Sequence, residues 1–182
     1  MAFLLFKIDN RLEDIELYGG SGLKKIAVSV MFNYLQQFED DLLSVLRTSK
    51  RYTPPASYAH LKELAAPFIG RGCKMGEGWL LTAEMLELIE SGYENIVCAQ
   101  PFGCLPNHIV GKGMIRAIRE THPDANILAV DYDPGATQVN QENRIKLMLA
   151  VGREKLAERS EEIREAAFVR GNADYAFSLM RK

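Results

Sequence analysis

Three cysteines are the residues of this chain best suited to chemistry. Cys98 and Cys104 lie at the two ends of a short loop, and Cys73 lies upstream in a glycine-rich stretch. Three is an odd number and too few for a disulfide scaffold, so the sequence indicates free thiols or metal ligation. Cys104 lies near the N-terminus of a predicted helix, and this position favours the thiolate form that binds metals. We therefore expect Cys104 to be the first candidate ligand, ahead of Cys73 and Cys98.

Each of these residues also has a plainer interpretation. Cys98 ends an apolar run and can be a small buried hydrophobic residue. The three cysteines with His108 form a possible Cys3His zinc set, although no Cys-x-x-Cys pair supports it. Cys104 and His108 could pair as nucleophile and base, but no orienting carboxylate is evident, and His108 is most simply a residue at the start of a helix.

The elements around the cysteines predict a parallel strand unit. Apolar residues 96–99 form a short buried strand, residues 109–121 have helical spacing, and residues 127–130 form a second buried strand. A strand, helix and strand in this order make a right-handed parallel unit, so the loops after both strands should lie at one sheet edge. Helix N-termini there favour an anion, such as a thiolate-bound cluster or a phosphate group. The pocket expected at this edge is lined by Gln100, Phe102, Gly103, Asn107, His108, Asp131, Asp133 and Gly135.

The rest of the chain is predicted to be mainly helical. Residues 2–8 read as a strand that ends at a turn over Asp9 and Asn10. Apolar positions recur at helical spacing over residues 23–46, and we expect this stripe to be core. Further helices are predicted over residues 57–66, from Thr82 to a stop at Gly92, and from Thr137 into a long charged segment. The glycine-rich residues 67–78 are irregular, and their backbone should pass close to another segment.

Composition limits the class of protein. The chain has 182 residues, with 22 basic and 24 acidic side chains, and no basic block typical of nucleic-acid binding. No apolar run is long enough to span a membrane, and no loop has the spacing that cradles a nucleotide phosphate. The sequence predicts a cytoplasmic α/β protein: a Rossmann-like parallel sheet with flanking helices, a helical N-terminal part and a long charged C-terminal helix. We expect a helical lead-in over residues 1–70 and the α/β portion over residues 71–182, together one compact unit.

Several motifs resemble one known family. The motifs are GEGWLLT at 76–82, QPFGCLPNH at 100–108, GKG at 111–113, DYDPG at 131–135 and NQENR at 140–144. They resemble the large activase-related proteins of the 2-hydroxyacyl-CoA dehydratase family, specifically from about residue 73 to residue 149. More distantly, the pattern is similar to the dehydratase subunits, whose Rossmann-like domains hold a 4Fe-4S cluster on cysteines.

The resemblance implies an iron–sulfur context for Cys73, Cys98 and Cys104, in which the chain contributes to a 4Fe-4S site for electron transfer. It also implies two binding partners: an actin-like ATPase activase portion or subunit, and an acyl-CoA. Family members carry that ATPase portion and further cysteine segments, which this chain lacks, so we expect a fragment or one component of a split system. Two other functions stay open: a non-catalytic interaction or scaffold domain that docks its charged last helix on the ATPase portion, and a zinc-stabilised structural domain.

Overall fold

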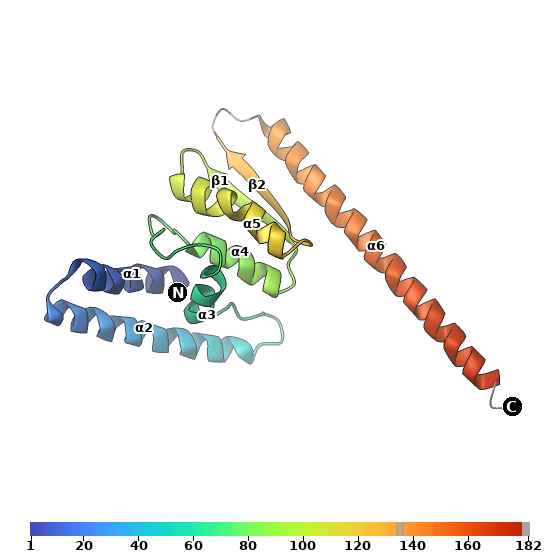
Figure 1. The fold of residues 1–182 in the computed structure, drawn as a ribbon, viewed down its shortest axis with the longest axis horizontal. Helices are drawn as coiled ribbons and strands as arrows, with labels where there is room; N and C mark the ends of the chain where they lie inside the picture. The colour runs from blue at the N-terminus through green and yellow to red at the C-terminus, as the bar shows by residue number, and fades with distance from the viewer. Residues whose placement is uncertain (134, 136, 180–182) are drawn as a thin grey trace.

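Six α-helices and two β-strands make up the described part of the chain, residues 1–133, 135 and 137–179, in a computed structural model (Figure 1). The elements follow one another as α1 (Ala2–Tyr18), α2 (Gly22–Arg47), α3 (Tyr58–Ala65), α4 (Leu80–Glu90), β1 (Asn95–Pro101), η1 (Asn107–Gly111), η2 (Lys112–Met114), α5 (Ile115–Thr121), β2 (Asn126–Tyr132) and α6 (Gln138–Leu179). The described residues therefore combine helices with a small parallel sheet.

The first helix corrects the prediction of a strand over residues 2–8. α1 continues without a break through Asp9 and Asn10, where the sequence predicts a turn. Its buried residues are Leu5, Phe6, Asp9 and Asn10, a spacing that places all four on one face of a helix. A short apolar run cannot by itself distinguish a strand from a buried helix. Packing against other helices decides the conformation here.

A buried polar cluster joins α1, α2 and α3, and we call it the Tyr58 cluster (Asp9, Glu39, Tyr58 and Lys62). The Tyr58 hydroxyl donates to Asp9 Oδ2 at 2.7 Å, and the Lys62 ammonium pairs with the same oxygen. Glu39 Oε2 accepts the backbone N–H of Tyr58 at 3.1 Å. Burial, and then the hydrogen bond to Asp9, raise the pKa of Tyr58, because ionisation would create a buried charge beside a carboxylate. Asp9 lies inside the protein because these partners satisfy it.

An aromatic cluster packs directly beside these polar groups. The indole ring of Trp79 contacts Phe6 edge-on at 5.3 Å and lies 6.0 Å from the ring of Tyr58. These contacts join α1 and α3 to the start of α4, so one core includes residues on both sides of position 70. The buried members are Leu5, Phe6, Tyr58, Leu61, Ala65, Trp79, Leu80 and Ala83.

Helix α2 forms where the sequence predicts it, but of its apolar stripe only Leu35 packs against the first hydrophobic cluster, and most of the stripe lies outside the core. Ile26, Val30 and Tyr34 are each more than 60% exposed. The helix is instead held by its opposite side, where Glu39 and Leu43 are buried. Periodicity correctly identifies an amphipathic helix, but it does not show which surface covers the apolar face.

The two strands pair in parallel, as predicted, with Ile96 opposite Ile127 and Gln100 opposite Asp131. One face of this sheet packs on a second hydrophobic cluster, which is built from α4, α5 and the strands. Its buried members are Met85, Leu86, Ile96, Ile118, Ala125 and Ile127.

The segment after β1 is more irregular than the single helix predicted over residues 109–121. It begins as the π-helix η1, continues as the short 3₁₀ segment η2, and only then becomes α5. A side chain at Gly111 would place its Cβ 3.2 Å from Cys98 Sγ, a tight contact that would require Cys98 to shift by a few tenths of an ångström, so glycine suits the close approach of η1 to β1. Wide π-turns of this kind occur often at functional sites.

The last helix packs on the sheet along its first half and then leaves it (Figure 1). Met148 is buried, and its carbonyl accepts from the Asn126 side chain at 2.9 Å. Further along, Arg159 pairs with Glu94 at 2.9 Å. Within the described residues, α6 included, none of the helices combines the length and apolar character that a membrane span requires.

Candidate cysteine site at the sheet edge

The loops after the two strands lie at one sheet edge, as the sequence predicts. The strands are parallel, and beyond their last pair the N–H of Phe102 still donates to the carbonyl of Tyr132 at 3.0 Å. The turn at Gly103 and the turn formed by Asp133 and Gly135 therefore follow the carboxyl ends of neighbouring strands. In open parallel sheets this is the edge where ligands usually bind.

Cys104 is half-buried and held at this edge by one amide. Its thiol donates to Asn107 Oδ1 at 3.0 Å, and Asn107 Nδ2 donates to the carbonyl of Ala99 at 2.9 Å. The carbonyl of Cys104 also accepts the N–H of His108, which opens the helical turn. Asn107 is itself buried, so it fixes the thiol relative to β1. The thiol pairs with Asn107 and not with the imidazole of His108, which gives no support to a nucleophile and base pair.

Cys98 lies on the covered face of β1, among packed groups. Gln100 Nε2 donates to its sulfur at 3.0 Å, and Gly111 of η1 lies directly against it. Burial raises the pKa of the Cys98 thiol, because the thiolate would lose solvation, and the hydrogen bond from Gln100 opposes this only in part. Cys98 thus has the surroundings of a structural thiol.

Cys73 is exposed, in the loop between α3 and α4. This loop closes on itself: the carbonyl of Cys73 accepts the N–H of Trp79 at 2.8 Å, and a Cβ at Gly78 would lie only 2.2 Å from that carbonyl oxygen. Gly78 also has φ +52°, which favours glycine. A Cβ at Gly76 would lie 3.0 Å from the ring of Pro106. The Cys73 loop therefore contacts the segment that follows Cys104, as the glycine content predicts.

The donor set of the described residues does not fit a complete metal centre. In the part of the chain that the structure describes, no three histidine, cysteine, aspartate or glutamate side chains form a group that could hold a metal ion. Neither three cysteines for a cluster nor a Cys3His set for zinc is brought together. A cluster needs thiolates from outside this arrangement.

The acidic side of the edge is partly neutralised. Asp131 Oδ2 lies 3.4 Å from Lys112 Nζ and 3.3 Å from Arg144 Nη1. Asp133 Oδ1 accepts the N–H of Gly135 at 2.9 Å, an ordinary aspartate turn. Asp131 is thus a structural ion-pair partner, while the Asp133 carboxylate is exposed.

The remaining predicted pocket residues divide into buried supports and exposed groups. Gln100 is fully buried, with no hydrogen-bond partner for its Oε1 among the described residues. Phe102 is 71% exposed, and Gly103 turns the chain with φ +67°. His108 is half-buried on η1. The edge thus presents an apolar ring and a thiol, supported by two buried amides.

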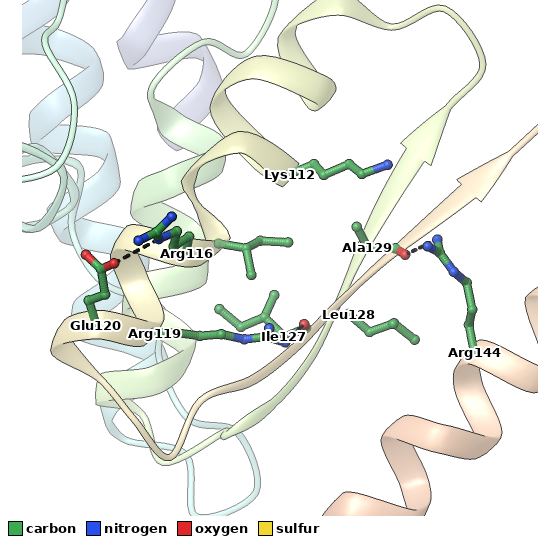
Figure 2. Close-up of a pocket in the computed structure, with 9 residues that line it drawn as sticks. Lys112, Arg116, Arg119, Glu120, Ile127, Leu128, Ala129 and Arg144 are labelled. Atoms are coloured by element: carbon green, nitrogen blue, oxygen red, sulfur yellow. Dashed lines mark hydrogen bonds and ion pairs between the residues drawn. The ribbon is translucent and has the colours of Figure 1, made fainter.

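Sequence reasoning missed a row of side chains along the outer edge of β2. Arg119 Nη2 donates to the carbonyl of Ile127, and Arg144 Nη1 donates to that of Ala129 at 2.9 Å, so both side chains reach the same strand from two helices (Figure 2). They line an open cleft of about 530 Å³ between α5, β2 and α6. The spacing of Gln141 and Arg144 is visible in the sequence, but their role depends on where α6 lies.

Comparisons with known proteins name no relative for this arrangement: no family model, curated protein or solved structure matches the chain.

Proposed function

We propose that this chain is a module of an iron–sulfur protein related to the 2-hydroxyacyl-CoA dehydratases and their activases, and that it supplies the Cys104 thiolate to a 4Fe-4S site completed by a partner. One observation carries the proposal: Cys104 is a half-buried thiol fixed by Asn107 at the carboxyl edge of a parallel sheet. The motifs at 100–108 and 131–135 support the family assignment.

The chain's own contribution in this role is positioning. Asn107 orients the thiol by bonding both the sulfur and β1, and the buried Gln100 supports the strand beneath it. Exposed Phe102 and Leu105 flank Cys104 and would exclude water once a partner covers them. When bound, the cluster supplies one-electron transfer. The strand, helix and strand of this region would be one unit of a larger Rossmann-like sheet, in a cytoplasmic protein.

The partner proposed is the actin-like ATPase portion or another cysteine-bearing segment of the same system, and an acyl-CoA is the substrate class that the family implies. The test is anaerobic reconstitution of the chain together with that partner, followed by iron and acid-labile sulfide analysis. We expect a broad charge-transfer absorption that Cys104→Ser reduces far more than the matched control Cys98→Ser. Equal retention in the two variants overturns the ligand assignment.

A second candidate is a non-catalytic interaction module, favoured by the projection of α6 beyond its contacts with the sheet (Figure 1). In this role the charged end of α6 docks on the ATPase portion, and Cys104 has no redox function. Complex formation that survives Cys104→Ser, with no iron or sulfide bound after reconstitution, would favour this candidate.

A further inference from the structure

The two outer edges of the sheet differ in how their backbone groups are satisfied. On β2 the outward carbonyls belong to Ile127, Ala129 and Asp131, because the even-numbered residues bond to β1. Side chains bond each of the three: Arg119 and Arg144 for the first two, as Figure 2 shows, and Gln141 Nε2 at 3.1 Å for the third.

This arrangement closes the edge of β2. An added strand would have to displace all three side chains to reach the carbonyls. It would also meet Lys112 and Arg116, which line the same cleft. Charged groups along an edge strand are a common protection against unwanted strand pairing. The sheet is therefore not built to grow on this side.

The outer edge of β1 has no comparable protection. Its outward groups belong to Asn95, Val97 and Ala99. Among the described residues only the carbonyl of Ala99 is bonded, by Asn107 at 2.9 Å and by Gln100 Nε2 at 3.5 Å. Val97 is 47% exposed and Ala99 is exposed, because α6 covers the sheet over β2 and not over these residues. The open edge runs for about five residues and ends at Pro101, which has no N–H to offer.

We propose that this open edge of β1 binds an extended segment of a partner chain, which adds a third strand to the sheet. The unbonded N–H and C=O groups of Val97 specify a backbone partner, and the apolar surface of Val97 and Ala99 specifies apolar side chains on one face of that strand. This inference rests on the proposed function, in which the chain assembles with a partner protein, because that partner would supply the added strand.

A second copy of this chain fits the edge less well. If two copies paired their β1 strands antiparallel about Val97, Pro101 of one copy would lie opposite Tyr93 of the other. At Pro101, η1 and the loop before it already lie beside β1. Tyr93 is a large side chain that is 54% exposed. A single extended segment from another protein avoids this crowding, because it needs to match only the open backbone.

The test uses the full chain and a peptide that carries no family sequence, Lys-Val-Thr-Val-Thr-Val-Lys, in residue-resolved amide hydrogen exchange. We expect the peptide to slow exchange of the Val97 and Ala99 amides about tenfold, as added backbone hydrogen bonds would, and to leave Ile127, Ala129 and Asp131 unchanged. Equal protection along β2, or no protection at Val97, overturns the proposal. Concentration-dependent protection of Val97 without peptide, together with a dimer in sedimentation, overturns the choice of a partner chain.

Proline variants give an independent arm. Val97→Pro removes an outward N–H and no bond to β2, and Ala129→Pro does the same on the closed edge, so each keeps the ladder between the strands. We expect Val97→Pro to weaken peptide binding about tenfold in fluorescence anisotropy and Ala129→Pro to leave it unchanged. Equal binding by both variants contradicts the proposal. The peptide readout needs no cluster, so it fails or succeeds separately from the iron analysis.

Discussion

The Tyr58 cluster and the Cys104 edge are both polar sites, but one is closed and the other is open. In the Tyr58 cluster each polar side chain interacts with a residue of another helix. The Asp9 carboxylate, for example, accepts from the Tyr58 hydroxyl and pairs with Lys62. At the Cys104 edge, the thiol has one amide partner and lies beside the exposed Phe102. A site whose interactions are complete stabilises the fold, whereas an incomplete one can bind something else.

The largest expected effect is in the closed region. Trp79 is 1% exposed and contacts both Phe6 and Tyr58, so Trp79→Ala should lower the free energy of unfolding by about 3–5 kcal/mol. Phe102→Ala, at 71% exposure, should change it by less than about 0.5 kcal/mol. Urea unfolding monitored by circular dichroism measures both. Similar losses in the two variants would remove the distinction between the regions.

A smaller effect is expected from the polar groups of the Tyr58 cluster. Tyr58→Phe removes the hydroxyl that donates to Asp9 but leaves the Lys62 ion pair. The free energy of unfolding should fall by about 1–2 kcal/mol, because Asp9 stays buried with one partner fewer. Tyr52→Phe is the matched control, since the Tyr52 side chain is exposed. An unchanged denaturation midpoint in Tyr58→Phe would mean that the hydroxyl hydrogen bond contributes nothing.

The ion pair between His60 and Glu90 should give a weak pH dependence. Nε2 of His60 lies 2.7 Å from Glu90 Oε2, and this hydrogen bond raises the pKa of His60 above 6.5. The stabilisation by this pair is therefore complete below pH 6.5, and it is lost as the pH rises through the higher pKa that His60 has in the folded protein. Both side chains are more than 40% exposed, so solvent screening limits the contribution to about 0.5 kcal/mol or less. The free energies of unfolding of the wild type and of His60→Gln, measured between pH 5.5 and 8.5, should converge at the alkaline end. A difference in stability that widens as the pH rises would contradict the predicted sign.

The smallest effect is expected on the exposed stripe of α2. Val30 is 63% exposed, so Val30→Glu should change the free energy of unfolding by less than about 0.5 kcal/mol. Leu43 is 4% exposed on the opposite side of the same helix, and Leu43→Ala should cost about 2–5 kcal/mol. Thermal melting of the two variants compares the faces directly. A severe loss in Val30→Glu would show that the stripe is core after all.

The parallel unit could be predicted because its signals are local. Two short apolar runs, at 96–99 and 127–130, are separated by a helical segment, and chain connectivity then places both following loops at one edge. The same reasoning correctly identifies the helices after residues 22 and 57. Here sequence periodicity and packing favour the same structure.

Other features depend on which surfaces meet, and periodicity does not contain that information. The segment 2–8 is apolar enough for a strand or a buried helix, and α1 forms because its face packs against α3 and Trp79. The stripe of α2 has core composition, yet most of it lies on the outside. The sequence ranks Cys104 ahead of Cys98 as a ligand, but it does not show the contacts of either thiol: Cys98 packs against Gln100 and Gly111 within the sheet unit, whereas Cys104 follows the end of β1.

The capping of β2 could not be predicted for the same reason. Arg119, Gln141 and Arg144 come from two helices and meet only along one strand. In the sequence they are ordinary polar residues of helix surfaces. Their common role becomes visible only when the order and direction of the strands are known.

The most direct test of the central claim is iron and acid-labile sulfide content after anaerobic reconstitution of this chain with its cysteine-bearing partner. The proposed role predicts about four irons per complex with wild-type chain and with Cys98→Ser, and a clear loss of iron and of charge-transfer absorption with Cys104→Ser. A complex that keeps its full iron content in Cys104→Ser would contradict the claim that this thiol is a ligand of the cluster.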